Sequence, residues 1–430
     1  MKLLVISFCF PPEAMPRSIQ VARLLRHLEG ADTVLLHGTD SRARFDPTIE
    51  PDAVDHIAER IQVPLPRPEW RRYVSAGAER LNLPLWNRLP DPYAVWKRPA
   101  LRAIEDWWSR TPRAPDVMVT FGNPMTDHLV GLAIARRHST PWIAHFSDPW
   151  VDNPYHRQDP LDRLVNARLE GAVVHAADRL AFPSEECAEY VLRPYPESVR
   201  RKVFILPAAY STDPVDRRML DPDTIVLRHI GEFYGPRTPK PLFQALRTLH
   251  ESAPETLDAV RVEIIGGANP GMFEAAGIRH LPAGLVTTRP HVSHRESIDL
   301  MGMADGLLLI DGPSTTRSIF LPSKLIEYIG VERPVFGIAP PGPAATLIDE
   351  LGGLTADPSD ATGIADQLRR FISLLRERRT SGADAWGNLE VRERFAAPHV
   401  ARAFRDEATR LIQHRGRAAA RELEPAEQTA

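Results

Sequence analysis

Short apolar runs alternate with amphipathic stretches along most of this chain. An apolar run rich in Val, Ile and Leu predicts a buried strand, and apolar residues three and four positions apart predict a helix. Before residue 208 this pattern predicts strands at residues 2–8, 33–36, 117–120, 142–146, 179–182 and 203–206, with helices between most of them. Strands and helices alternating at this spacing are typical of βαβ units in a parallel sheet.

A polar, proline-bearing segment at residues 208–223 interrupts the alternation, which then restarts. The second half predicts strands at residues 224–230, 260–265, 285–287, 306–311 and 335–338. We therefore expect an α/β fold with two doubly wound, Rossmann-like parallel-sheet domains. Such sheets bind ligands at the carboxyl ends of their strands, so a cleft that both domains face is the expected site.

The breaks in the pattern give the expected domain boundaries. Residues 1–207 form an N-terminal domain and residues 208–390 a C-terminal domain. Residues 391–412 form a connection and a terminal helix, at residues 398–411, that crosses back to the first domain, and residues 413–430 form a charged, alanine-rich tail that we expect to fray.

Residues 40–113 break the rhythm of the first domain and are interpreted as an insertion. Five of the eight tryptophans fall in this segment, accompanied by many arginines: Trp70, Trp86, Trp96, Trp107 and Trp108. Tryptophan with arginine suits a carbohydrate platform or a membrane interface. The plain alternative is that these side chains pack a helical insertion onto the sheet.

Composition excludes several classes of protein. The 430-residue chain has a net charge of -3, whereas a general nucleic-acid binder would be strongly basic. Two cysteines cannot form a disulfide framework and fit a reducing compartment. No apolar run is long enough to span a bilayer. We expect a cytoplasmic protein, in solution or at the inner face of the membrane, with no nucleic-acid partner.

Residues 321–328 carry the most informative chemistry of the chain. Ser323 and Lys324 begin a predicted helix after a strand and a polar loop. A helix N-terminus attracts phosphate through its N–H groups and dipole, and a lysine adds a full charge. Glu327, one turn later, can bind two hydroxyls of a ribose. The plain alternative is a helix-capping Ser323, a solvated Lys324 and an ordinary first-turn Glu327.

Four segments in order resemble one known family. Residues 1–13, 141–150, 230–237 and 322–328 resemble the GT-B glycosyltransferases, most of all glycosyltransferase family 4. The resemblance implies a GT-B fold. It also implies retaining transfer of a sugar from a nucleoside diphosphate sugar to a saccharide or lipid-linked acceptor, in bacterial polysaccharide or glycolipid assembly. No cofactor is implied beyond the donor itself.

On the donor side, the resemblance implies that Arg237 and Lys324, with Ser323, bind the diphosphate and that Glu327 binds the ribose. Gly231 opens the donor segment. A departing diphosphate gains negative charge, which either a metal ion or fixed positive groups must stabilise. The one Asp-x-Asp, residues 221–223, precedes a strand rather than following one. We therefore expect no metal.

On the acceptor side, His145 and Asp148 are the catalytic candidates. Asp148 follows a predicted strand, where it either binds sugar or acceptor hydroxyls, orients a catalytic histidine, or simply caps the turn before Pro149. His145 lies inside the apolar run, where it either faces the expected cleft or is a hydrogen-bonded core histidine.

Two positions depart from the family pattern. Relatives often have two glycines at Ala14 and Met15, and often have a glutamate at Ile319, eight positions before Glu327. The role of that acid is then lost, or moved to Asp311 or to the backbone around residues 315–318. Two alternatives to transfer stay open: a catalytically degenerate GT-B subunit, and a GT-B sugar-nucleotide epimerase or hydrolase. A nicotinamide oxidoreductase is disfavoured because no Gly-x-Gly-x-x-Gly follows the first strand.

Overall fold

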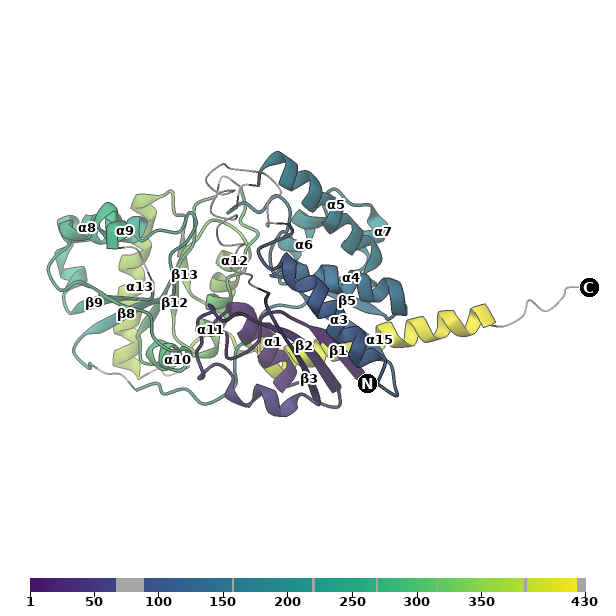
Figure 1. Ribbon diagram of the computed structural model, residues 1–430. Helices are drawn as coiled ribbons and strands as arrows, with labels where there is room; N and C mark the ends of the chain where they lie inside the picture. The colour runs from purple at the N-terminus through teal and green to yellow at the C-terminus, as the bar shows by residue number, and fades with distance from the viewer. Residues whose placement is uncertain are drawn as a thin grey trace, which may run out of the picture. The chain divides into compact units, whose positions relative to one another are not determined.

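The computed structural model describes residues 1–66, 89–156, 158–218, 221–267, 270–314, 316–382 and 385–423. The chain divides into two compact units (Figure 1). Unit 1 comprises Met1–Pro207 and Pro398–Ala430, and unit 2 comprises Ala208–Ala397. Each unit is built on its own parallel sheet.

In the part of the chain that the structure describes, unit 1 contains a seven-stranded parallel sheet of order β3-β2-β1-β4-β5-β6-β7. Its strands are β1 (Lys2–Ile6), β2 (Asp32–Thr39), β3 (Glu59–Pro64), β4 (Val117–Phe121), β5 (Trp142–His145), β6 (Arg179–Phe182) and β7 (Val203–Ile205). The strand order reverses between β1 and β4, whose first partners in register are Leu3 and Val117. That reversal is where doubly wound sheets bind ligands.

Helices cover the sheet of unit 1: α1 (Pro16–Arg26), η1 (Pro51–His56), η2 (Ala94–Trp96), α3 (Lys97–Trp108), α4 (Thr126–His138), α5 (Pro160–Ala176), α6 (Glu185–Leu192), α7 (Glu197–Arg200) and α15 (Ala397–Leu423). Helices α3, α4 and α5 lie side by side (Figure 1). The starts of the helices follow local chemistry. Pro16 opens α1, where its missing N–H costs nothing, and the Ser184 hydroxyl caps α6 by accepting the Cys187 N–H at 3.2 Å.

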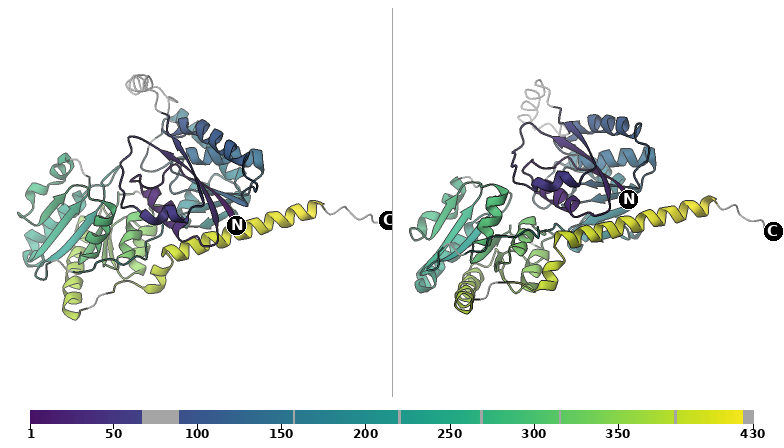
Figure 2. Two further views of the ribbon diagram at one scale, coloured as in Figure 1. Left: turned by 60° about the horizontal axis from the view of Figure 1, so that its bottom comes forward. Right: turned by 90° about the horizontal axis from the view of Figure 1, so that it is seen from below.

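The terminal helix α15 lies along unit 1 (Figure 2). Arg179 of β6 forms an ion pair with Glu407, and Arg415 Nε donates to Asp178 at 3.0 Å. The helix continues to Leu423, so the expectation of a helix that ends at residue 411 and a tail from residue 413 was wrong in its boundary. Arginine and alanine, which dominate the last turns, are good helix formers and favour a helix that continues past residue 411.

The interpretation of residues 40–113 as an insertion needs correction. Strand β3 pairs with β2 as the edge of the sheet, and α3 packs against it. The strand was missed because it is largely exposed and mixes polar with apolar residues, as edge strands do. Trp96 and Trp107 are buried in the core of unit 1, and Trp108 stacks on His138. For these three side chains the packing alternative holds; Trp70 and Trp86 lie outside the described residues.

Within its described residues, unit 2 contains a six-stranded parallel sheet of order β10-β9-β8-β11-β12-β13. Its strands are β8 (Ile225–Ile230), β9 (Val260–Ile265), β10 (Val286–Arg289), β11 (Gly306–Ile310), β12 (Val335–Ile338) and β13 (Leu354–Ala356). Strands β8, β11 and β12 are buried along their whole length, as expected for parallel strands covered on both faces. The strand order reverses between β8 and β11.

The helices of unit 2 are α8 (Lys240–Ser252), η3 (Pro254–Leu257), α9 (Pro270–Ala276), η4 (Ile278–His280), α10 (His294–Gly302), α11 (Ser323–Gly330), α12 (Pro343–Glu350), α13 (Ala361–Ser381) and α14 (Leu389–Glu393). Helices α8 and α13 pack against each other, and their apolar faces meet the core under β8, β9 and β12. Across the described ranges of both units, no helix combines the length and apolar character needed to cross a membrane.

Candidate functional site

The donor-side candidates of unit 2 gather at the carboxyl ends of β8 and β11, where the strand order reverses. Gly231 follows β8, Asp311 follows β11, and Lys324 lies in the first turn of α11, the helix after β11. This is the position at which open parallel sheets bind their ligands. The sequence segments that were read separately are thus brought together at one edge of one sheet.

Lys324 is held closely against the end of β8. Its Nζ lies 3.4 Å from Nε2 of His229, and its side chain passes over Gly231. A Cβ at Gly231 would come within 2.4 Å of that Nζ, and Gly231 has a φ of 134°. Burial, together with the nearby charge of Arg237, lowers the pKa of Lys324 to about 7, while Asp311 and Glu232 act in the opposite direction. The amine is therefore poised to gain a proton when an anion binds.

Arg237 is the second cation at this edge. Its Nε donates to Asp311 Oδ1 at 2.8 Å, and its guanidinium lies 4.6 Å from the ring centre of Tyr234. Arg237 and Asp311 are both buried. Asp311, suggested above as a substitute for the missing family acid, forms an ion pair with Arg237 here, and Ile319 at the family position is buried. The pair fixes the orientation of the guanidinium.

Helix α11 places Ser323 and Glu327 beside Lys324. Pro322 occupies the position before the helix and no side chain caps it, so Ser323 is the first helical residue rather than the cap. The buried face of α11 includes Tyr328, whose hydroxyl accepts the Ile230 N–H at 3.0 Å. While this face is fixed against β8, Ser323, Lys324 and Glu327 are the partly exposed residues of the first turns of α11.

Two glycine turns bring the backbone close at this edge. Gly266 has a φ of 133°, and a Cβ there would lie 2.6 Å from the carbonyl oxygen of Gly231. Only glycine allows the loops after β8 and β9 to approach so closely. Beside them, Nε2 of His291 lies 2.9 Å from Oε1 of Glu232, and both side chains are exposed.

In unit 1, His145 ends β5 and is buried. Its Nε2 lies 3.1 Å from the Leu206 carbonyl, and its Nδ1 lies 3.3 Å from a guanidinium nitrogen of Arg17. A carbonyl only accepts, so Nε2 carries the proton and Nδ1 accepts from Arg17. Burial, with the charge of Arg17, lowers the pKa of His145 to about 3. The ring is neutral with both nitrogens engaged, which agrees with the core-histidine alternative.

Asp148 is partly exposed at the turn after β5. Its Oδ2 accepts the Ser147 hydroxyl at 3.0 Å. The turn is anchored from α5, since the Trp150 indole N–H donates to Asn166 at 3.1 Å and the Val151 N–H to Glu170 at 3.2 Å. Asp148 therefore has a fixed backbone and an accessible carboxylate, as a group that contacts substrate requires.

Arg17 was not singled out from the sequence. It is buried in the first turn of α1, donates to Gln20 and to the Gly122 carbonyl, and reaches His145. Burial lowers the pKa of Arg17 to about 10, and Asp148 is the first charge that opposes this shift. The sequence shows only an arginine after a proline in the segment that follows the first strand. This pattern does not distinguish a buried functional arginine from a surface arginine.

Two buried carboxyls tie together the loops at the sheet reversal of unit 1. Glu13 accepts the Asp40 N–H and Asp127 accepts the Phe8 N–H, both at 2.8 Å. Burial raises the pKa of Glu13 to about 7 and that of Asp127 well above its usual value. Both carboxyls hold backbone in place at the edge where Asp148 lies.

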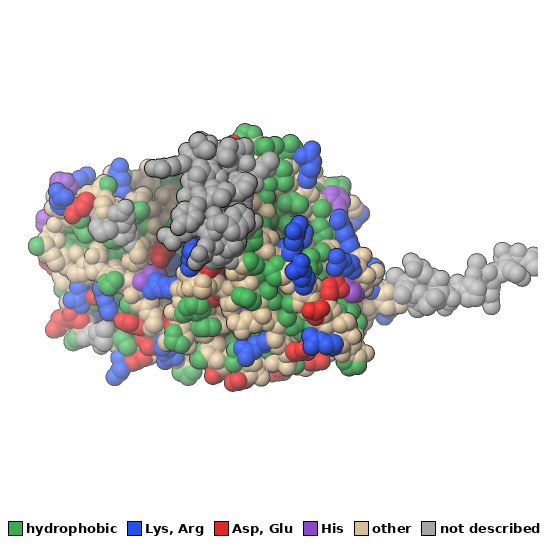
Figure 3. Space-filling model, viewed as in Figure 1, with side chains coloured by type: hydrophobic (Ala, Val, Ile, Leu, Met, Phe, Trp, Pro, Cys, Tyr) green, Lys and Arg blue, Asp and Glu red, His purple; other side chains and the backbone are tan. Residues whose placement is uncertain are grey.

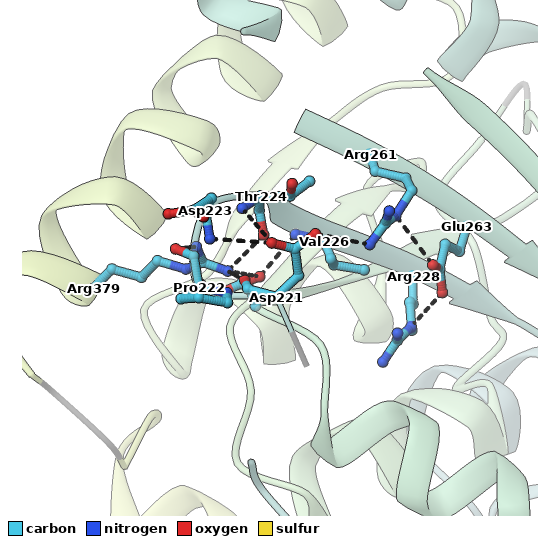
Figure 4. A network of polar contacts seen from close by, with 10 residues as sticks. Asp221, Pro222, Asp223, Thr224, Val226, Arg228, Arg261, Glu263 and Arg379 are labelled. Atoms are coloured by element: carbon cyan, nitrogen blue, oxygen red, sulfur yellow. Dashed lines mark hydrogen bonds and ion pairs between the residues drawn. The ribbon is translucent and has the colours of Figure 1, made fainter. Parts of the chain in front are cut away.

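The Asp221–Asp223 segment has a structural role. Asp221 accepts the N–H groups of Asp223 and Thr224 at 3.1 Å, and Arg379 donates to three carbonyls of the same turn (Figure 4). The segment precedes β8, at the sheet edge opposite Lys324. In the described parts of the chain, no three His, Cys, Asp or Glu side chains are grouped as metal ligands would be. Metal independence stays a prediction.

Known proteins supply an independent comparison. Residues 20–209 match the family model described as a glycosyl transferase 4-like domain. A search of curated protein sequences finds no match. Among solved structures, sucrose-phosphate synthase from Thermosynechococcus elongatus aligns over 96% of this chain and 100% of its own, with 16% identity and a TM-score of 0.64.

Two further solved structures are similar over nearly their whole length. The α,α-trehalose 6-phosphate synthase from Burkholderia multivorans has 15% identity and a TM-score of 0.61, covering 97% of this chain and 99% of its own. Anabaena HepE in complex with UDP and glucose has 12% identity and a TM-score of 0.57, covering 98% and 99%. The predicted GT-B fold and the resemblance to family 4 glycosyltransferases are confirmed.

Proposed function

We propose that this chain is a retaining glycosyltransferase that moves a sugar from a nucleoside diphosphate sugar to a saccharide or lipid-linked acceptor. The observation that carries the proposal is the pair of cations, Lys324 and Arg237, at the sheet reversal of unit 2. The solved structure of Anabaena HepE, which has the same fold, is described with UDP and glucose bound, and this supports a nucleotide-sugar donor.

Unit 2 would bind and activate the donor. As the bond to the sugar breaks, negative charge grows on the diphosphate, and fixed cations that are already oriented stabilise it without reorganisation. Asp311 orients Arg237, and the N-terminus of α11 with Ser323 adds the helix dipole. Glu327, one turn later, would bind the ribose hydroxyls, and Gly231 leaves room for the Lys324 side chain that would face the phosphates. These groups would make a metal unnecessary.

Unit 1 would bind the acceptor. The accessible carboxylate of Asp148 is suited to accept hydrogen bonds from sugar hydroxyls. His145 contributes through Arg17: its neutral Nδ1 accepts from the guanidinium, which keeps a positive charge near Asp148. We therefore propose Asp148 as the residue that touches the acceptor and His145 as a residue that positions its surroundings.

The experiment that tests the donor site is a thermal-shift screen of the full chain against UDP, GDP, ADP, dTDP and CMP. At a hundredfold its dissociation constant, a ligand raises the free energy of unfolding by about 2.7 kcal/mol. One nucleoside diphosphate should raise the melting temperature, with chelator present. The shift should vanish in Lys324→Ala and persist in Lys240→Ala, the exposed lysine at the start of α8. No shift with any nucleotide would reject the proposal.

A degenerate subunit is the second candidate function. Ile319, buried where family 4 members often have a glutamate, favours it because the sugar of the donor would lack one contact. Nucleotide binding with no turnover of any donor would support this candidate. Release of nucleoside diphosphate that needs no acceptor would instead indicate a hydrolase or an epimerase.

A lipid-linked acceptor would place the protein at the inner face of a bacterial membrane. Leu161 and Leu164 of α5 are exposed, and hydrophobic side chains reach the surface of unit 1 where α5 lies (Figure 3). Co-sedimentation with anionic vesicles at low salt tests this peripheral contact. If all of the protein stays in the supernatant, the proposed membrane contact is rejected.

A further inference from the structure

His229 lies inside β8, one residue before the strand ends, and has no exposed surface. Its ring stacks on Phe233 with the ring centres 4.5 Å apart and the planes 14° from parallel. An apolar residue would fill this place at less cost, because a buried polar ring needs hydrogen-bond partners. The hydrogen-bond partners of the His229 ring therefore indicate its role.

The hydrogen bonds of His229 fix its tautomer. Nδ1 lies 3.0 Å from the carbonyl oxygen of Leu308 on the neighbouring strand β11. That oxygen can only accept, so Nδ1 carries the proton. Burial, with the adjacent charge of Lys324, lowers the pKa of His229 well below its usual value, so the ring is neutral. Nε2 is then an acceptor, and the group that faces it, at 3.4 Å, is Nζ of Lys324.

The position of the Lys324 amine is determined from two sides. Nε2 of His229 accepts from it, and Gly231 leaves the gap through which the lysine side chain passes. The charged groups around the amine are Arg237, Asp311 and Glu232. A carboxylate in place of His229 would neutralise the ammonium, whereas a neutral imidazole holds it and leaves its charge for an anion.

We propose that His229 is a positioning residue of the donor site, whose unprotonated Nε2 holds the Lys324 ammonium in place for the donor diphosphate. The inference rests on the proposed function, because it requires a diphosphate at Lys324. His229 itself is buried beneath the lysine and touches no substrate. Its effect on binding is transmitted through one hydrogen bond.

Two substitutions separate this role from packing. Asparagine places an amide N–H where Nδ1 lies and so keeps the bond to Leu308, but it does not extend to the Nε2 position. Glutamine reaches that position with an oxygen that accepts from Lys324. Calorimetric titration of the full chain with the nucleoside diphosphate that binds wild type best should show His229→Asn weakened about tenfold, as for one hydrogen bond to a charged group. His229→Gln should remain closer to wild type.

A purely structural histidine predicts no difference in affinity between the two variants. Both variants would then lose melting temperature while their dissociation constants stay at the wild-type value, or His229→Gln would bind as weakly as His229→Asn. The pH profile gives a second readout. Without its acceptor the ammonium is less stable, so the pH above which affinity declines should move down in His229→Asn; an unmoved profile would contradict the proposal.

The wild type also provides a test that needs no folded variant. Nitrogen-15 spectra of labelled histidine should show His229 as the Nδ1–H tautomer with an unprotonated Nε2 throughout pH 6–8; a protonated Nε2 would overturn the inference. Different results would reject the inference and the proposed function. If Lys324→Ala abolishes binding and His229→Asn binds like wild type, only this inference falls. If wild type binds no nucleotide, the proposed function falls and the inference with it.

Discussion

Arg237 donates through Nε to Asp311 at 2.8 Å, and this buried ion pair joins the loop after β8 to the end of β11. Removing one partner of such a pair leaves the other charge uncompensated, at a cost of roughly 3–5 kcal/mol. We expect Asp311→Asn to lower the free energy of unfolding by about 3 kcal/mol in urea titrations. Glu251→Gln, which breaks the exposed pair with Arg247, is the control and should cost less than about 0.5 kcal/mol.

The same variant should respond more strongly to ligand than wild type does. In Asp311→Asn a bound diphosphate supplies the negative charge that Arg237 has lost. The rise in melting temperature with saturating nucleoside diphosphate should therefore exceed the wild-type rise. An equal or smaller rise would mean that Arg237 does not face the diphosphate.

Gly231→Ala should disable Lys324 without removing it. The new Cβ would lie 2.4 Å from Nζ of Lys324, so the ammonium must move. Affinity for the nucleoside diphosphate should fall at least about tenfold, because one hydrogen bond to a charged group is lost. Gly284→Ala is the matched control: it has a φ of 82°, is exposed and meets no neighbour within 4 Å, so it carries backbone strain but should bind as wild type.

Donor binding should depend on pH through Lys324. Its pKa of about 7 in the free protein means that the amine is part neutral at pH 7, and an anion favours the protonated form. Affinity for a nucleoside diphosphate sugar, whose phosphates do not titrate near neutrality, should be constant below pH 6 and fall as pH rises above 7. Calorimetry in buffers of different ionisation enthalpy should report proton uptake at pH 8. Binding without proton uptake would contradict this assignment.

Asp127 should behave as a neutral carboxylic acid. Burial and the charge of Asp91 raise the pKa of Asp127 well above its usual value. Folded protein therefore keeps a proton that unfolded chain loses, so wild-type stability falls as pH rises from the ordinary aspartate pKa to the raised pKa of the folded protein. Asp127→Asn should remove that part of the dependence and match wild type at acidic pH. Asp127→Ala should cost about 2 kcal/mol, because the Phe8 N–H loses its acceptor.

Asp148 should affect transfer and leave donor binding unchanged. Asp148→Asn keeps the shape but loses the charge that accepts acceptor hydroxyls, so kcat/KM should fall by about tenfold to a hundredfold. Nucleoside diphosphate affinity and melting temperature should stay at wild-type values, because the side chain is partly exposed. A changed nucleotide affinity would place Asp148 on the donor side instead.

Several elements were predicted from the sequence with the bounds that the structure shows. Strands β6, β9 and β12 have the predicted bounds, since an apolar run, or apolar residues that alternate along the segment, marks a strand with a buried face. Strand β3 was missed because an edge strand lacks such a run, and β13 because three residues are too few to show a pattern.

In the candidate site, too, some features could be predicted from the sequence and others could not. Lys324 and Glu327 were identified because they lie three residues apart at a helix start, which is a local signal. The pairing of Arg237 with Asp311, and the contacts of His229 with Leu308 and Lys324, depend on β8 lying next to β11. These strands are far apart in the chain, so only the strand order reveals the contacts.

The central claim is that Lys324 belongs to a diphosphate site. The most direct measurement is a calorimetric titration of the full chain with the nucleoside diphosphate selected by the thermal screen, in wild type, Lys324→Ala and Lys240→Ala. We expect one saturable site. Its affinity should fall at least about tenfold in Lys324→Ala, because one charged contact is lost, and should be unchanged in Lys240→Ala. Equal affinity in all three proteins would contradict the claim.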